Sequence, residues 1–148
     1  MTRDFKHRLV AEAISQSPYL SESFQAAERT VNAWRDANLI GSEAIPELFA
    51  RTSFEADEVL FRAWRTMLNH WGRMATAYYS GVIDQEVARK MYSSGFLSFM
   101  GRYESFIKSK MSSVTYQDTF KLFSEWTTSS STNVTRLPKT FGGPNVSP

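Results

Sequence analysis

The sequence predicts an all-α fold, a single-domain bundle of about five helices with a disordered C-terminal tail. Apolar side chains recur at helical spacing along most of the 148-residue chain, and strand-like alternation is almost absent. Aromatic residues make up 14% of the sequence, which supplies large side chains for one core. Residues 127–148 are instead rich in Ser, Thr, Gly and Pro. We therefore divide the chain into a helical domain, 1–126, and a flexible tail, 127–148.

Two helices are predicted before residue 46. The first covers roughly residues 3–16, where Phe5, Leu9 and Ala13 share one face. The second covers about residues 21–40, and Gly41 is its expected C-terminal stop, because glycine readily adopts the left-handed conformation that ends many helices. The apolar stripe of this second helix, which must face other helices, consists of Leu20, Phe24, Ala27, Val31 and Trp34.

The clearest helical pattern covers residues 54–80. It follows a short piece around residues 46–50, and Thr52 with Glu55 has the spacing of a capping box at its start. Trp71 lies at the centre of the stripe, so we expect its side chain to be in the core. The stripe consists of Leu60, Trp64, Met67, Trp71, Met74 and Tyr78, and is widened by Phe61, Leu68, Ala75 and Tyr79.

A tight turn is predicted at residues 80–84, with Gly81 as the left-handed cap and Asp84 as the N-cap of the next helix. That helix, about 85–110, is expected to bury Val87, Met91, Leu97, Met100, Tyr103 and Ile107. A closing helix begins near Thr115, which could cap its first turn together with Asp118. Its inward or partly inward residues are Tyr116, Phe120, Phe123 and Trp126.

Composition excludes several classes of site. The chain has no cysteine, which excludes disulfides, thiolate metal sites and a cysteine nucleophile. The N-terminus is charged throughout and lacks the apolar core of a signal peptide. No uninterrupted apolar run is long enough to cross a bilayer. We therefore expect a soluble, cytoplasmic protein without a membrane partner.

The net charge of +2 conceals a division along the chain. Residues 1–60 carry 6 lysines and arginines against 10 aspartates and glutamates, a net charge of −4. Residues 61–126 carry 9 against 5, a net charge of +4. The helical domain is therefore neutral overall, which is far less basic than expected of a dedicated nucleic-acid binder.

No catalytic, cofactor or metal site is predicted. The stretch richest in chemistry surrounds His70, which lies at the edge of the apolar stripe and is expected to be a boundary side chain rather than a catalyst. A di-iron bundle needs Glu-x-x-His on two helices, but Asp4 and Met67 stand three residues before His7 and His70. Glycine-rich phosphate loops and serine nucleophile elbows are absent from the sequence. A solvated first helical turn accounts for the acidic cluster Glu55, Asp57 and Glu58.

One surface pattern could bind a partner. By helix geometry, four side chains of the 54–80 helix project within roughly 80° of one another, opposite the apolar stripe. They are Arg62, Arg65, Asn69 and Arg73, which we call the arginine ridge. The ridge is either a surface for an acidic protein or a phosphate backbone, or simply the solvated outer face that an exposed helix must have. The aromatic residues pose a similar choice between core and a groove for a partner helix or apolar ligand.

Residues 60–126 also carry a resemblance. The run VLFRAWRTMLNHWGRMATAYYSGVIDQEVARKMY, with the later FMGRYESFIKSKM and YQDTFKLFSEW, resembles a bacterial helical family of unknown function. That family joins a Leu/Phe-rich helix to a Gly-hydrophobic-Asp turn, a second helix with an aromatic-rich end and a short closing helix. The resemblance implies an all-α fold and no particular activity. The matching residues are Leu68, Trp71, Ala75, Gly81, Ile83, Asp84, Tyr103, Phe106, Ile107 and Trp126.

These observations favour a non-enzymatic protein–protein interaction module, an adaptor or an inhibitor of a larger complex, that acts through an exposed helix face. The first alternative is a nucleic-acid-associated protein that uses the arginine ridge. A small apolar-ligand sensor or an enzyme is the third.

Overall fold

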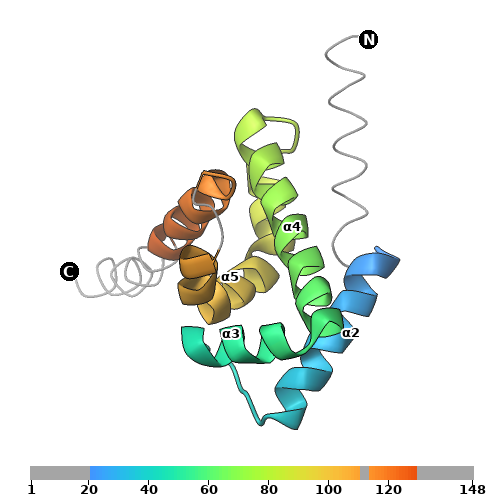
Figure 1. Cartoon of the computed structure of the whole chain (residues 1–148). Coiled ribbons are helices and arrows are strands. Elements are labelled where there is room, and N and C mark those ends of the chain that lie inside the picture. The colour runs from blue at the N-terminus through green and yellow to red at the C-terminus, as the bar shows by residue number, and fades with distance from the viewer. Residues whose placement is uncertain (1–20, 111–113, 130–148) are drawn as a thin grey trace, which may run out of the picture.

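The computed structural model describes residues 21–110 and 114–129. These residues form α2 (Glu22–Ala37), α3 (Glu47–Ala56), α4 (Glu58–Ser80), α5 (Gln85–Lys110) and a closing helix at residues 117–129, without a strand among them (Figure 1). The predicted all-α class is therefore confirmed. The helix expected at residues 3–16 and residues 130–148 of the expected tail lie outside the described residues.

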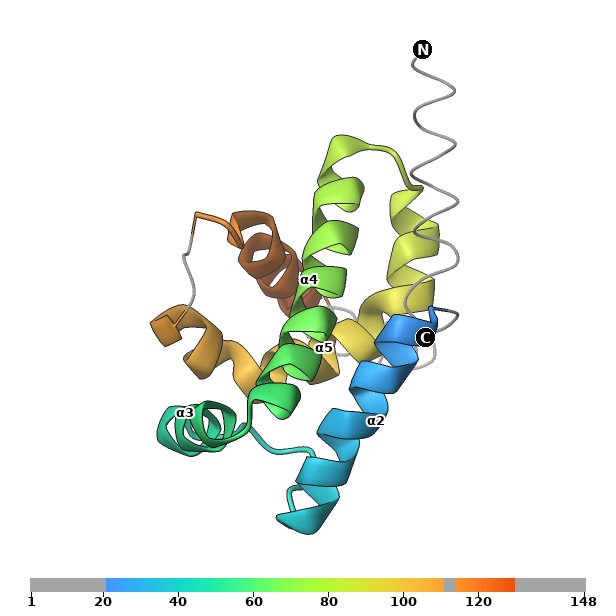
Figure 2. The same ribbon diagram turned by 45° about the vertical axis from the view of Figure 1, so that its right-hand side comes forward.

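Helix α4 lies at the centre of the fold. It packs against α2, α3 and α5, and α3 also packs against α5. Figure 2 shows the first part of α5 running back beside α4 from the connecting turn, before the helix turns toward α3. None of the described helices has both the length and the hydrophobicity that a bilayer span requires.

Helix α2 ends earlier than predicted. Its N-cap is Ser21, whose Oγ accepts a hydrogen bond from the Phe24 N–H at 3.4 Å. The helix stops at Ala37, and the left-handed position falls on Leu39, with φ of 56°, rather than on Gly41. Asn38 is the C-cap, and its backbone N–H and its Nδ2 both donate to the Trp34 carbonyl, at 3.1 and 2.8 Å.

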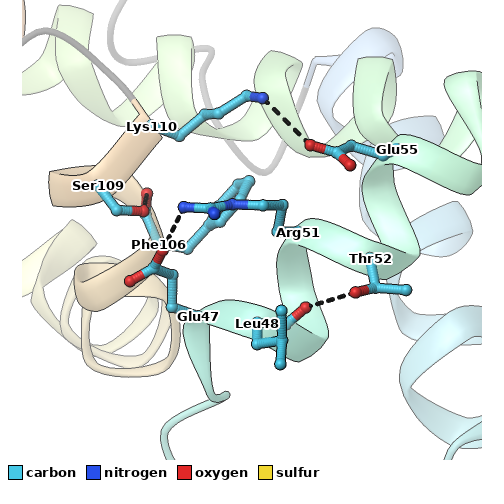
Figure 3. Close-up of polar contacts among 8 residues, drawn as sticks. All are labelled: Glu47, Leu48, Arg51, Thr52, Glu55, Phe106, Ser109 and Lys110. Carbon is cyan, nitrogen blue, oxygen red and sulfur yellow. Dashed lines mark hydrogen bonds and ion pairs between the residues drawn. The ribbon is translucent and has the colours of Figure 1, made fainter.

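The boundary between α3 and α4 also differs from the prediction. Thr52 lies inside α3, where its Oγ1 donates to the Leu48 carbonyl at 2.8 Å, so it does not cap the next helix (Figure 3). The N-cap is Asp57, whose Oδ1 accepts from the Leu60 N–H at 3.0 Å. Apolar residues continue at helical spacing across this break, and for that reason the sequence pattern did not reveal it.

Polar contacts join α3 to the end of α5 (Figure 3). Lys110 Nζ of α5 lies 3.5 Å from Glu55 Oε1 of α3. Glu47 and Arg51 form an ion pair within α3. Both pairs are at least one-third exposed, so each contributes little to stability, and the packing of α3 depends on its buried residues Ala50 and Phe54.

The α4 stripe is buried as predicted, and Trp71 is 2% exposed. The Trp71 ring lies 5.7 Å from Phe24 of α2 and 5.9 Å from Phe96 of α5, measured between centroids. Trp64 packs in the same way against Phe54 of α3, at 5.2 Å. The fully or nearly buried members of the stripe are Leu60, Trp64, Met67, Leu68, Trp71, Met74 and Ala75, and Phe61, Tyr78 and Tyr79 are partly buried.

The buried face of α5 differs from the prediction in its first half. Val87 and Met91 are 47% and 46% exposed, whereas Met100, Tyr103 and Ile107 are buried as expected and Leu97 is partly buried. Two apolar faces compete at the start of this helix, and the aromatic one faces the core because it removes more apolar area from water. That face consists of Ala88, Tyr92, Phe96 and Phe99.

The closing helix crosses α4 at Gly72. A Cβ at Gly72 would lie 3.6 Å from Thr119 Oγ1 and 3.8 Å from the Tyr116 ring. Tyr116 and Trp126 are buried, and Phe120 and Phe123 are partly buried, as predicted. The helix continues to residue 129, beyond the expected boundary of the helical domain at 126.

Two glycines provide a matched test of the backbone. Gly81 has φ of +78° and space around it, so Gly81→Ala should lower the free energy of unfolding by about 1 kcal/mol through backbone strain alone. Gly101 lies in helical α5, and a methyl group added there would meet nothing within 4 Å, so Gly101→Ala should raise that free energy by about 0.5–1 kcal/mol. Urea unfolding of both variants measures the difference; equal effects would contradict the left-handed turn.

The aromatic centre gives a second test. Trp64→Ala should lower the free energy of unfolding by about 3–5 kcal/mol, because the side chain is fully buried among other rings. Leu48→Ala is the control, since Leu48 is 73% exposed and should change stability by less than about 0.5 kcal/mol. Urea unfolding monitored by far-UV circular dichroism compares them, and similar midpoints would refute the core assignment.

Candidate functional site

The arginine ridge forms the outer face of α4. Arg62, Arg65, Asn69 and Arg73 are all exposed, as helix geometry predicted. Their positions on a long helix whose opposite side is packed into the core fix the backbone beneath them. The ridge is therefore a fixed row of side chains rather than a group brought together from loops.

Its members have different neighbours. Arg62 forms an ion pair with Glu58 at 2.7 Å on the open surface. The Arg65 guanidinium lies 5.9 Å from the centroid of the Phe61 ring. Asn69 Oδ1 accepts a hydrogen bond from the Tyr116 hydroxyl at 3.1 Å, which links the ridge to the start of the closing helix. Within the described residues, neither Arg65 nor Arg73 has a carboxylate at ion-pair distance.

His70 is buried, not at the boundary where we expected it. It is 7% exposed because Phe24 of α2 covers its ring, with centroids 5.0 Å apart. Arg73 Nη2 lies 3.2 Å from His70 Nδ1; a guanidinium only donates, so Nδ1 accepts and Nε2 carries the hydrogen. Burial, with a smaller contribution from the Arg73 charge, lowers the pKa of His70 from 6.5 to about 4. The imidazole is therefore neutral at pH 7.

The acidic residues do not gather into a metal site. Within the described part of the chain, no group of three or more His, Asp or Glu side chains is placed to hold a metal ion. The three acids that the sequence places near the start of α4 have separate neighbours. Glu55 faces Lys110, Asp57 caps α4 and Glu58 pairs with Arg62.

A pocket of about 230 Å³, which the sequence did not reveal, lies between α2, α4 and α5. Part of its wall is apolar and part is polar. The apolar lining consists of Phe24, Val31, Met67, Trp71 and Phe99, and the polar lining of Glu28, Asn32, Arg35, Ser98, Arg102 and Tyr103.

Two arginines converge at this pocket, Arg35 from α2 and Arg102 from α5, and we call them the arginine pair. Arg35 Nη2 and Arg102 Nε both donate to the carbonyl of Gly41, at 3.1 and 3.3 Å. Burial and then the Arg35 charge lower the pKa of Arg102. Backbone N–H donors, assisted by both arginines, lower the pKa of nearby Glu43. The pair thus places two guanidinium groups beside the pocket, with the Glu43 carboxylate close enough to interact with both.

Tyr103 adds a buried polar group to the pocket. Its side chain is 1% exposed, and its hydroxyl has no hydrogen-bond partner among the described residues. Burial raises the pKa of Tyr103 to about 12, and the charges of Arg35 and Arg102 oppose that shift. The Trp71 indole N–H and the Arg35 Nε are likewise buried without a partner in the described structure. These three polar atoms are thus shielded from solvent at residues that line the pocket.

The arginine pair escaped sequence analysis because its members come from two helices that are far apart in the chain. Each arginine follows or precedes an aromatic residue, Trp34 or Tyr103, but such neighbours do not distinguish a pocket from a helix boundary. The predicted ridge lies on the solvent side of α4, whereas the pocket is lined by the core side through Met67 and Trp71.

The buried histidine predicts a specific pH dependence. The folded pKa of His70 is below the unfolded value, so its stabilising contribution is complete above pH 6.5 and is lost as the pH falls toward 4. Between pH 7 and pH 5 the wild type should lose about 2 kcal/mol more stability than His70→Gln, which lacks the titrating group. Urea unfolding of both proteins at the two pH values measures this; equal losses would refute a buried neutral His70.

Comparison with known protein families finds a match over most of the chain. The family described as Domain of unknown function (DUF4760) matches residues 12–130, which extends well beyond the resembling segment 60–126. No curated protein and no solved structure is significantly similar to the chain.

Proposed function

This chain belongs to the DUF4760 family, a family of unknown function, and we propose that it is a non-enzymatic interaction module that binds an acidic protein surface through the arginine ridge. In this proposal it acts as an adaptor or an inhibitor of a larger complex. A cytoplasmic setting and a bacterial or phage source are part of the proposal. They rest on the absence of cysteine and on the sequence resemblance of residues 60–126.

The observation that carries the proposal is that, within the described residues, Arg65 and Arg73 have no carboxylate at ion-pair distance. Both are exposed on one face of α4, and their described neighbours are an aromatic ring and a neutral imidazole rather than carboxylates. A guanidinium offers a planar set of donors that matches a carboxylate in a bidentate arrangement. The two side chains can therefore receive acidic groups from a partner without first breaking an internal ion pair.

Overall charge favours a protein partner over nucleic acid. The chain carries a net charge of only +2, and Glu58 stands beside Arg62 at one end of the ridge. A protein binds a phosphate backbone through many cationic contacts. These contacts release the counterions condensed on the nucleic acid, and that release drives association. Three arginines with an adjacent carboxylate suit a short acidic patch better than a continuous phosphate chain.

The environment of His70 supports a role without catalysis. This histidine lies beside Arg73 of the ridge, but it is buried against Phe24 and its Nδ1 accepts from Arg73. A catalytic base must reach the proton that it removes. His70 instead positions Arg73 from below.

A charge-matched comparison tests the ridge. The triple variant Arg62→Gln, Arg65→Gln, Arg73→Gln should fold normally, because exposed charges contribute little to stability. It should bind a polyglutamate peptide, used as a model acidic chain, at least about tenfold more weakly than the wild type, mainly through slower association. The control replaces three exposed cations elsewhere, Arg29→Gln, Lys90→Gln and Lys108→Gln, and changes the net charge equally. Biosensor kinetics at low and physiological salt compare the three proteins; equal weakening by both triple variants would refute a specific ridge.

The same proteins test the nucleic-acid alternative. We expect no measurable binding of wild type to duplex DNA at physiological salt. Submicromolar binding in an anisotropy titration, lost only in the ridge variant, would put nucleic acid first. Its affinity would then fall with salt at a slope near about −0.9 for each phosphate neutralised.

A further inference from the structure

We infer that the pocket between α2, α4 and α5 binds a small organic anion, whose carboxylate or phosphate group is held by the arginine pair and whose apolar body lies against the aromatic wall. This site is separate from the arginine ridge and does not depend on the proposed function.

The first argument is the convergence of two like charges. Arg35 and Arg102 each donate to the same carbonyl oxygen, at 3.1 and 3.3 Å, which holds both guanidinium groups close together. Within the described residues, neither has a carboxylate at ion-pair distance. Two cations so close repel each other; the nearby Glu43 carboxylate offsets part of that repulsion, and an anion bound between the guanidinium groups would offset more of it.

The second argument is that the pair retains unused donors. Arg35 Nη1 donates to Asn32 Oδ1 at 3.2 Å, and Arg102 Nη1 donates to Ser98 Oγ at 2.8 Å. With Gly41 added, these bonds leave Arg35 Nε and Arg102 Nη2 without an acceptor in the described structure. The hydrogen bonds that exist fix each guanidinium in place, so the remaining N–H groups are already oriented.

The third argument concerns the pocket wall. Six buried side-chain nitrogen or oxygen atoms lack a partner among the described residues, and three of them belong to residues that line this one pocket: Arg35, Trp71 and Tyr103. The nitrogen atoms are donors only, and the tyrosine hydroxyl can donate. All three atoms are shielded from solvent as the side chains lie, so an acceptor on a ligand would reach them only after a shift of the pocket wall.

The fourth argument is size and shape. A pocket of about 230 Å³ lies below the usual range for drug-sized ligands but is far larger than one water requires. Phe24, Trp71 and Phe99 provide flat apolar surface beside the charged end. Glu28 also lines the pocket and would accept from a hydroxyl or amino group on the ligand. The class that fits is a single-ring or short-chain acid.

Calorimetric titration of the full chain with four probes tests this inference. Benzoate and phenyl phosphate carry an anion on a ring, inorganic phosphate lacks the ring, and benzamide has the shape of benzoate without the charge. We expect one or both ring-bearing anions to bind, and benzamide to bind at least about tenfold more weakly, because it cannot form charge-assisted hydrogen bonds. The stronger of benzoate and phenyl phosphate identifies the preferred anionic group.

Variants locate the binding. Arg102→Gln should lower the affinity for the anion about 10- to 100-fold, whereas Arg62→Gln on the ridge should leave that affinity unchanged. Arg102→Lys keeps the charge and the fold but loses the fork of donors, so its affinity should lie between those of wild type and Arg102→Gln. Tyr103→Phe should lower the affinity for the anion several-fold. It should not lower the melting temperature of the ligand-free protein, because the hydroxyl that it removes has no partner among the described residues.

Several results would overturn the inference. They are no saturable binding of either ring-bearing anion up to roughly 10 mM, equal binding by Arg102→Gln and wild type, or inorganic phosphate binding as tightly as the ring-bearing anions. A clear loss of ligand-free stability in Tyr103→Phe would show that the hydroxyl is already satisfied and would also count against it.

Discussion

The other helices are positioned by packing against the buried aromatic stripe of α4. Trp64 packs against rings from two other helices, Phe54 of α3 and Phe106 of α5, at centroid distances of 5.2 and 5.1 Å. About two turns further along the helix, Trp71 receives Phe24 of α2. Each large ring removes more than about 150 Å² from water. The packing of these rings therefore sets the positions of the surrounding helices. The positions of the helices in turn determine where the ridge and the pocket lie.

The connection between α2 and α3 is held to α5 by its backbone. The Ile45 N–H donates to the Arg102 carbonyl at 2.9 Å, and the Gly41 carbonyl accepts from the arginine pair. These bonds cross from one helix connection to the middle of a distant helix. They explain how α2 and α5 can present Arg35 and Arg102 to one pocket although α2 packs chiefly on α4.

The two candidate surfaces lie on opposite sides of α4 and differ in character. The ridge is open to solvent, where charge governs the rate and specificity of encounter more than affinity. The pocket lies between three helices and joins an apolar wall to the arginine pair, whose hydrogen bonds to Gly41 are at its exposed side. His70 lies between the two surfaces, with Arg73 of the ridge at its Nδ1 and Phe24 of the pocket against its ring.

Local sequence was enough to predict the helical class, the stripe of α4, the left-handed cap at Gly81 and the exposure of the arginine ridge. It also predicted Asp84 as the cap of α5, where its Oδ1 accepts from the Val87 N–H at 2.9 Å. These features repeat at helical spacing or depend on neighbouring residues, so local sequence contains the information. Tertiary packing decided what local patterns leave open. It selected Tyr92 and Phe96 rather than Val87 and Met91 as the buried face of α5, because Phe96 packs against Trp71 of α4 and against Phe123 and Trp126 of the closing helix.

The two candidate sites differ in the same way in how far the sequence predicts them. The ridge comes from one helix, and its periodicity alone placed it. The burial of His70 beneath Phe24 and the meeting of Arg35 with Arg102 both require elements that are distant in the chain. No spacing along the sequence encodes such a contact, since only the folded arrangement of α2, α4 and α5 brings those side chains to one place.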